Sequence, residues 1–416
     1  MKRTLIRLIS AVLLSALLIA LPGGACALTP QGHWFNQYVP EVKNSGLYDA
    51  VLSDDFLPDM PITEQDFCNI FYTFFSLPSL EGPAVPSKAP LSRLRAAEII
   101  CRELKLWIPN ISAEVKDAYI ANIADYYEIA DEDSREVILT AYINGVMSGH
   151  SDGRFAPNDD VTWAEALTML VNLKNDANGS VPETLFGASP QYTHTLIAEQ
   201  TGFVDIIESV CKELGVDYTI FVSCYRRPVT ELSTGETAML NRVRAALPAP
   251  DAETVMQKVI SLSDMEKYLS GEYTAPKGFV SRACDVKQYR TYDDCYYGLR
   301  LDYEYPEGVY PHQLETGSCG VIRFTAENAA SVIIPTSVKN GGTYTDPAPF
   351  GGAGFTTGTN GRVGSPEWVF TDWAQLDSGA ELYELDRNGN EVLRGVYDAR
   401  IDRFVEVGAE RNRTAA

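Results

Sequence analysis

Cysteine and histidine, the residue types that most often bind metals or act as nucleophiles, are not spaced for either task in this sequence. The cysteines are Cys26, Cys68, Cys101, Cys211, Cys224, Cys284, Cys295 and Cys319. None of them forms the closely spaced pairs of a structural zinc site, and the histidines at 33, 150, 194 and 312 are scattered. The sequence therefore predicts no metal centre. We interpret Cys68 and Cys101 as small core residues, because both lie in apolar stretches with helical periodicity.

Two further features of the C-terminal half have the composition of a reactive or ligand-binding site. Cys284, Cys295 and Cys319 lie in a region rich in predicted strands, where one pair of them could form a disulfide. Cys319 has no possible catalytic partner beyond His312, so a cysteine nucleophile is not favoured. Residues 386–391 (DRNGNE) resemble a calcium loop in composition, but they lack its ligand spacing and its distal glutamate. We interpret them as a hairpin turn.

The clearest signals of secondary structure in the sequence lie between residues 142 and 170. Gly145 is placed to end one helix, because glycine readily adopts the left-handed conformation of a helix C-terminus. An Asp-Gly pair at 152–153 predicts a tight turn. Thr162 then begins a second helix, and Glu165, three residues later, completes the sequence of a capping box. The stretch is therefore predicted to be a helix, a turn and a second helix.

This layout resembles the S-layer homology (SLH) repeat of bacterial cell-surface proteins. Residues 149–157 (GHSDGRFAP) match the family loop G-x-x-D-G-x-F-x-P. Residues 161–165 (VTWAE) stand where the family has I-T-R-A-E, with Trp163 in place of arginine. Similar features divide the region 33–174 into three repeats, at about 33–76, 90–107 (a partial repeat) and 112–174. One such repeat cannot bury its own apolar side chains, so several must pack together.

The other two repeats depart from the family pattern at the start of their second helices. In the first repeat Thr63 is the predicted helix cap and Glu64 replaces the arginine. The second repeat keeps the arginine as Arg93, but Arg95 stands where glutamate is expected. A carboxylate at position 64 would repel an anionic sugar. At most one groove therefore keeps the family's arginine.

The resemblance implies a compact pseudo-threefold helical bundle whose grooves bind pyruvylated secondary cell-wall polysaccharide. An arginine beside a helix N-terminus offers two parallel donors to a ketal carboxylate, which makes this chemistry sensible. Carried onto this sequence, the predicted polysaccharide-binding residues are Arg93, Trp34, Asp152, Gly153, Trp163 and Glu165. A second interpretation also stays open, in which a degenerate module is kept only as a scaffold or spacer.

The N-terminus has the pattern of a secretory leader. Lys2, Arg3 and Arg7 form a basic segment, residues 8–21 are an apolar run, and small residues predict cleavage after Ala27. We therefore expect residues 1–27 to be a signal peptide. Lipidation of Cys26 is the alternative, although Gly23 stands where lipoprotein signals carry an aliphatic residue.

The net charge of this 416-residue chain limits the classes of partner that it is expected to bind. At −22, an acidic surface argues against nucleic acid and against an anionic membrane as ligands. Beyond the leader, no apolar run approaches the length of a membrane span. We expect a secreted protein of the cell wall or cell surface, without a transmembrane segment in the mature chain.

A second domain is predicted over residues 193–410, after a linker at 175–192. Its pattern changes from helices to short strands, so we expect an α+β domain with antiparallel pairing. Two capping boxes are predicted, Ser233 with Glu236 and Ser263 with Glu266. Strands are predicted at 218–224, 278–286, 296–303, 320–324, 331–335, 367–370, 380–386 and 391–397, the last two joined by an Asn-Gly turn at 388–389.

This second domain faintly resembles the ADP-ribosyltransferase fold of bacterial toxins. That family uses an arginine on an early strand, a serine on a middle strand and a late glutamate, for which Arg226, Ser281 and Glu367 are the candidates here. Under this resemblance NAD would be the substrate, with its pyrophosphate held by Arg226. If the resemblance does not hold, Arg226 is a surface charge at a strand end and Glu367 is a solvated edge residue. In that case no cofactor is expected.

Together these patterns predict an α+β protein of several domains. The favoured interpretation is an exported protein held non-covalently on secondary cell-wall polysaccharide, or on a peptidoglycan-linked glycan, that displays its second domain outward. The alternative is a secreted ADP-ribosyltransferase-like enzyme with a degenerate SLH module. The sequence leaves the activity of the second domain open.

Overall fold

The structure is a computed structural model. It describes residues 33–44, 57–75, 86–108, 111–175, 190–305, 307–345 and 349–407. The chain divides into two units, one made of Met1–Ala96 with Pro157–Asn175 and the other of Ala97–Ala156 with Asp176–Ala416. The predicted signal peptide and most of the predicted linker lie outside the described residues.

The helices of the first unit begin where capping side chains are available. Thr63 accepts the N–H of Asp66 at 3.1 Å, and the Thr63 hydroxyl donates to the Asp66 carboxylate at 2.7 Å. Thr162 and Glu165 form the reciprocal bonds of the predicted capping box, at 3.2 and 2.8 Å. Both predicted helix starts are therefore confirmed. The elements are η1 (Trp34–Gln37), α2 (Val39–Asn44), α4 (Glu64–Phe74), the start of α5 (Arg93–Glu103) and α8 (Trp163–Asn175).

Three short backbone segments of this unit hydrogen bond in a closed ring. The N–H of Ile62 donates to the carbonyl of Val161 at 2.9 Å, that of Val161 to Leu91 at 2.8 Å, and that of Leu91 to Ile62 at 2.8 Å. All three side chains are buried. Each segment leads directly into a helix, so the ring fixes the starts of α4, α5 and α8 beside one another.

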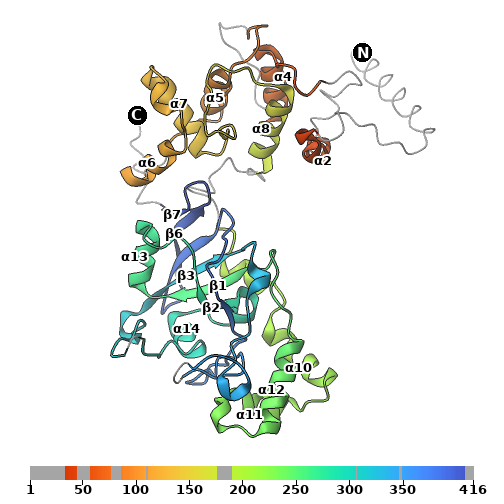
Figure 1. Ribbon diagram of the computed structural model, residues 1–416, viewed down its shortest axis with the longest axis vertical. Helices are drawn as coiled ribbons and strands as arrows, with labels where there is room; N and C mark the ends of the chain where they lie inside the picture. The colour runs from red at the N-terminus through yellow and green to blue at the C-terminus, as the bar shows by residue number, and fades with distance from the viewer. Residues whose placement is uncertain are drawn as a thin grey trace, which may run out of the picture. The chain divides into compact units, whose positions relative to one another are not determined.

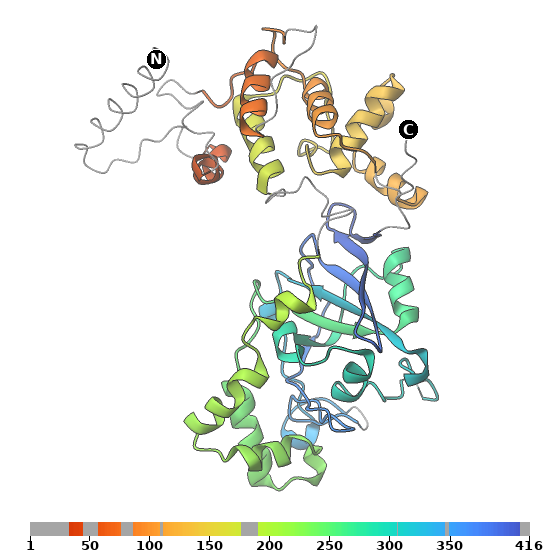
Figure 2. The same cartoon turned by 180° about the vertical axis from the view of Figure 1, so that it is seen from behind.

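The second unit is built on a seven-stranded antiparallel sheet, drawn in Figures 1 and 2, with the strand order β4-β2-β1-β3-β5-β6-β7. Helix α13 covers one face, where Ile322 and Phe324 of β3 join its core. Helix α14 covers the other, where Val321 and Cys319 point. The strands are β1 (Met256–Ile260), β2 (Gly278–Arg282), β3 (Ser318–Phe324), β4 (Trp368–Phe370), β5 (Glu381–Asp386), β6 (Glu391–Asp398) and β7 (Arg403–Glu406).

The helices of this unit precede the sheet in the chain or lie between its strands. Helices α10, α11 and α12 pack on one another around Phe221 and Leu240, with Phe355 from a later loop. The mixture of helices with an antiparallel sheet confirms the α+β class. The helices are α6 (Ala113–Ala121), α7 (Glu132–Ile143), α9 (His194–Ala198), α10 (Phe203–Glu213), α11 (Tyr218–Tyr225), α12 (Thr234–Ala246), α13 (Leu262–Ser270) and α14 (Tyr292–Gly298).

One of the predicted strands is a helix in the structure, and another is a helix only in its first residues. Residues 218–224 belong to α11, which Asp217 caps by accepting the N–H of Ile220 at 3.0 Å. The residues 296–303 include the end of α14, which begins with a capping box between Thr291 and Asp294. Both segments contain β-branched or aromatic residues that favour strands, but the caps at Asp217 and at Thr291, five residues before position 296, favour helices. These two strand predictions were wrong.

Other predicted elements differ in their limits. The hairpin of β5 and β6 is confirmed, with Gly389 at a φ of 83° in its turn. Residues 331–335 form no strand: they begin at the last residue of the 3-10 turn η6 (Ala329–Ser331) and contain a single bridge between Ile333 and Val369. The capping box of α12 is confirmed, whereas α13 is capped by Ser261 rather than by Ser263. Strands β1 and β7 were not predicted from the sequence.

Helices α6 and α7 are joined to the hairpin of β6 and β7 by a buried polar cluster within the second unit. The Tyr119 hydroxyl donates to the Asp398 carboxylate at 2.6 Å, and both side chains are buried. Arg400 pairs with Asp398 at 2.6 Å. Arg400 also donates to the last carbonyls of α7, those of Tyr142 and Ile143. The guanidinium therefore supplies hydrogen bonds to the carbonyls left without helical partners at the C-terminus of α7, and it also neutralises a buried carboxylate.

We expect this cluster to make the second unit sensitive to acid. Burial alone would raise the pKa of Asp398, but hydrogen bonds and charge from Arg400, with the Tyr119 hydroxyl, hold it below its usual value. A depressed pKa stabilises the folded state above the unfolded value of about 4, and the gain is lost as pH falls through the folded pKa. Urea unfolding between pH 6 and pH 2.5 measures this loss. An Asp398→Asn variant with the same acid dependence would contradict the assignment.

Candidate functional site

The candidate site is the part of the first unit where helices α4, α5 and α8 begin. The first residue of each helix donates its N–H to the segment before another helix. Glu64 donates to Ala89 at 3.2 Å, Arg93 to Asp159 at 2.9 Å and Trp163 to Met60 at 3.0 Å. Positions 64, 93 and 163 are therefore equivalent in the three segments, as the sequence alignment of the repeats predicted.

Ion pairs connect neighbouring segments at these positions. Arg93 is the first residue of α5, and its Nη1 lies 3.6 Å from Oε1 of Glu165, the third residue of α8. Glu64, the first residue of α4, pairs with Arg95, the third residue of α5, at 2.8 Å. The second pair has its charges exchanged relative to the first. Glu64 and Arg95 each depart from the family pattern, but together they keep an ion pair between the same two positions.

The Arg93 side chain is only 6% exposed in this arrangement. Its guanidinium faces Glu165, which also accepts the N–H of Thr162 at 2.8 Å. Arg93 and Glu165 are thus the two predicted polysaccharide-binding residues that the structure brings into contact. Their geometry shows a connection between α5 and α8, and their role in glycan binding stays a prediction.

Large apolar side chains are exposed beside this site. Trp34 is 45% exposed, Leu57 61% and Met60 52%. His33 bonds to Asp59 at 3.0 Å, which brings the turn of Trp34 next to the segment that carries Leu57 and Met60. Sequence reasoning predicted Trp34 but missed Leu57 and Met60, because single apolar residues in a loop carry no pattern. We call Trp34, Leu57 and Met60 the Trp34 surface.

Two further predicted residues, Asp152 and Gly153, shape the loop before α8, while Trp163 is the first residue of that helix. Asp152 is exposed and accepts the N–H of Arg154 at 3.0 Å, and Gly153 has a φ of 81° that favours glycine. Asp125, which is 2% exposed, accepts the N–H groups of Phe155 and Ala156 at 2.7 and 2.8 Å. Asp152 and Gly153 lie in the second unit, and their part in glycan binding is also still a prediction.

The three catalytic candidates of the second domain lie on different elements: Arg226 at the end of α11, Ser281 in β2 and Glu367 directly before β4. Ser281 in β2 is buried and its hydroxyl lies 3.4 Å from the carbonyl of Pro366, next to Glu367. Arg226 instead caps the C-terminus of α11, since the strand expected to carry it is a helix. No contact described for Arg226 reaches Ser281 or Glu367 within residues 190–407. The strand on which the ADP-ribosyltransferase resemblance relied is therefore absent.

A different arginine approaches Glu367. Arg244 of α12 is 2% exposed and donates to the carbonyls of Gly354 and Glu367 at 2.8 and 2.6 Å. Its guanidinium lies 4.1 Å from the ring centroid of Trp368, and burial lowers the pKa of Arg244 to about 10. Sequence reasoning missed this residue, because an arginine within a polar helix normally lies in solvent.

The cysteines differ from one of the expectations. All those in the described ranges are free and buried, which confirms the core placement of Cys68 and Cys101, and the predicted disulfide among Cys284, Cys295 and Cys319 is not formed in the structure. A hydrogen bond with Cys295, together with burial, raises the pKa of the Cys319 thiol well above its ordinary value. Among the described residues, no cluster of His, Cys, Asp and Glu is arranged to hold a metal ion. None of the described helices combines the length and the apolar content needed to cross a membrane.

Comparison with known proteins gives one family. The model of the S-layer homology domain matches residues 122–167, while no curated protein and no solved structure matches the chain. The matched segment runs from the end of α6 to the start of α8, and it includes Asp125, the loop of Asp152 and the capping box of Thr162. The family indicates a protein of the cell surface or cell wall. The chain is therefore an S-layer homology domain-containing protein.

Proposed function

We propose that this protein is exported and held non-covalently on the cell wall, where its S-layer homology repeats bind secondary cell-wall polysaccharide. The family match supports the attachment to a wall polymer in general. The proposal adds the export, the polymer and the surface that binds it. The domain over residues 193–410 is then displayed outside the cell.

The observation that carries this proposal is the closed ring of Ile62, Leu91 and Val161. It supports a pseudo-threefold helical bundle, because three segments with the same hydrogen-bonding pattern each lead into a helix. The exchanged ion pair between Glu64 and Arg95 supports it further. A repeat whose charges have changed together has kept the connection between neighbouring helices.

The Trp34 surface supplies the contact that a sugar needs. An indole presents a flat apolar face on which the C–H groups of a sugar ring can stack. Trp34 is held in place by the neighbouring rings of Phe35 and Tyr38, each 6.0 Å away between centroids. An ordered and exposed aromatic side chain loses little conformational entropy when it binds. We therefore place polysaccharide binding at this surface, beside the start of α8.

Replacing Trp34 by alanine should weaken wall binding about tenfold, the loss typical of a central aromatic contact. The measurement is the fraction of the full chain that sediments with purified bacterial cell wall carrying pyruvylated secondary polysaccharide, titrated over wall concentration. Trp107→Ala is the matched control, because Trp107 is 60% exposed but belongs to the second unit. Equal loss in both variants, or no sedimentation of the unchanged chain, would contradict the proposal.

Treatment of the wall identifies the polymer. Mild acid removes pyruvate ketals, and extraction of the secondary polysaccharide leaves peptidoglycan. Binding that is lost after the ketals are removed assigns the anionic group as part of the ligand. Binding that survives extraction of the polysaccharide instead assigns a glycan linked to peptidoglycan.

A further inference from the structure

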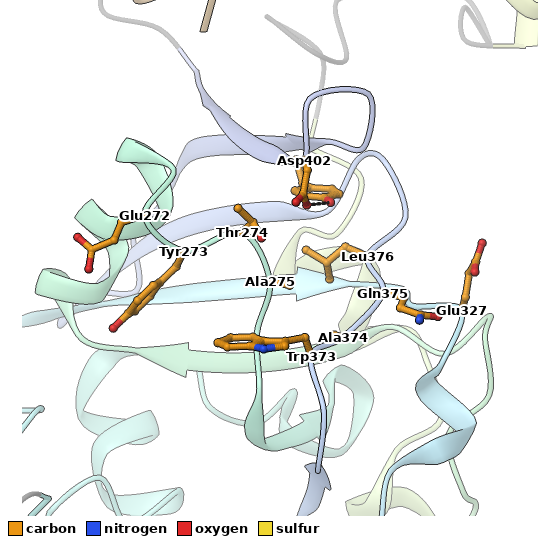
Figure 3. A pocket seen from close by; sticks show the side chains of 11 residues that line it. Glu272, Tyr273, Thr274, Ala275, Glu327, Trp373, Ala374, Gln375, Leu376 and Asp402 are labelled. Atoms are coloured by element: carbon orange, nitrogen blue, oxygen red, sulfur yellow. Dashed lines mark hydrogen bonds between the residues drawn. The ribbon is translucent and has the colours of Figure 1, made fainter. Parts of the chain in front are cut away.

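A cavity of about 610 Å³ opens in the second unit, and its lining residues all follow the SLH segments in the sequence (Figure 3). Three aromatic rings line it, those of Trp373, Tyr273 and Tyr397. Figure 3 shows the indole of Trp373 at one side of the space and Asp402 at the other, with Leu376 between them. Pockets of this size normally hold a small molecule or one extended side chain.

Trp373 is 54% exposed, yet its backbone is fixed by hydrogen bonds on both sides. Asn328 donates through Nδ2 to the carbonyl of Trp373 at 3.0 Å and accepts the N–H of Gln375 at 2.9 Å. The N–H of Ala374 donates to Pro276 at 2.9 Å. A large aromatic ring that is exposed at the wall of a cavity and held in place offers a ligand a flat contact surface.

The charged side chains that line the cavity are all acidic. Glu272, Glu327 and Asp402 contribute carboxylates, and none of the described residues that line the space is a lysine, an arginine or a histidine. Asp402 is held in place by the hydroxyl of Tyr397, which donates to it at 2.7 Å. The carboxylates therefore disfavour an anionic ligand, including a pyruvylated glycan, and favour a cation.

The aromatic rings already attract cations from the chain itself. The ammonium of Lys277 lies 5.5 Å from the ring centroid of Trp373, and that of Lys267 lies 4.8 Å from the ring centroid of Tyr273. Such distances are those of cation–π contacts. The cavity thus combines the electron-rich face of Trp373 with carboxylates that line the same space, the combination that recognises organic ammonium groups.

We propose that this cavity binds an alkylammonium ligand, with the ammonium group between Trp373 and the carboxylates and the alkyl stem along Leu376. A free polyamine and a lysine side chain of a peptide share this chemistry. The cavity is larger than an ammonium group, so an alkyl stem of several carbons fits inside it. This binding is independent of the proposed wall attachment, because none of the residues that line the cavity belongs to the Trp34 surface.

Calorimetric titration of the full chain with spermidine and with acetyl-Lys-Lys-Lys-amide tests the proposal. Trp373→Ala should weaken binding about fivefold, as expected for a partly exposed cation–π contact, and Trp373→Phe should weaken it less. Trp107→Ala, which removes an equally exposed indole elsewhere, should leave the affinity unchanged. Lys277→Gln should tighten binding about twofold, because it removes a like charge from the ring.

The two ligands distinguish the source of the ammonium group. Tighter binding of spermidine assigns a free polyamine, and tighter binding of the peptide assigns a basic protein segment. Binding should also weaken as salt rises, since the carboxylates of Glu272, Glu327 and Asp402 are exposed. Absence of binding by both ammonium ligands would overturn the proposal. Equal binding of neutral cellotriose, insensitive to salt and to Lys277→Gln, would overturn it in favour of a carbohydrate site.

Discussion

Replacing Arg400 by alanine will lower the free energy of unfolding of the second unit by about 3 kcal/mol. The change leaves the carboxylate of Asp398, which is 1% exposed, without its cation. It also removes the donors to the last two carbonyls of α7, those of Tyr142 and Ile143. Buried ion pairs cost about 3–5 kcal/mol when one partner is removed, and the 26% exposure of the Arg400 side chain places the effect at the lower end.

Hydrogen exchange of the full chain is the suitable measurement, because a protein of several units need not unfold in one step. Peptides from α6, α7 and the β6–β7 hairpin should lose protection together in Arg400→Ala. Arg387→Ala is the matched control, since its pair with Asp293 is 44% and 37% exposed and is worth less than about 1 kcal/mol. A loss confined to the hairpin, with α7 unaffected, would show that Arg400 does not connect the two segments.

This cluster also shows the limit of reasoning from sequence. Tyr119 and Asp398 are separated by 279 positions, and neither has a local pattern that predicts the other. Sequence motifs predicted the structure correctly where a few neighbouring residues determine it. Thr162 with Glu165 and the turn at Gly389 formed as predicted, because caps and tight turns depend on a few neighbouring residues.

Segments decided by competition between signals were less predictable. Residues 218–224 have the apolar and β-branched composition of a strand, but Asp217 provides a cap and the helix buries Phe221, Cys224 and Tyr225 on one side. These residues are spaced three and four apart, a period that fits a helix as well as the composition fits a strand. The burial of that face against α10 and α12 then decides the outcome.

The candidate site shows both situations. The family loop and the position of Arg93 could be recognised in the sequence, because each lies within a short motif. The compensation between Glu64 and Arg95 could not, since each looks like an isolated departure until the structure places them 2.8 Å apart. The cavity at Trp373 was not predicted either, because its lining comes from four separate segments of the chain.

Replacing Leu91 by proline will unfold the first unit and abolish wall binding. Proline has no N–H, so the bond from Leu91 to the carbonyl of Ile62 is lost and the ring is opened. The side chain, which is 1% exposed, also loses packing volume. Together these effects should cost about 4 kcal/mol or more, which is a large part of the stability of a small unit.

Leu91→Ala separates the two contributions, because alanine keeps the N–H and loses only the packing. It should cost about 2–4 kcal/mol and leave measurable binding, whereas Leu91→Pro should leave none. Hydrogen exchange in α4 and α8 reports the folding of the first unit, and co-sedimentation with cell wall reports its binding. The sheet domain should keep its protection in both variants, since the ring lies in the other unit. Equal effects of alanine and proline would mean that the backbone ring does not hold the three helix starts together, and the pseudo-threefold arrangement would lose its support.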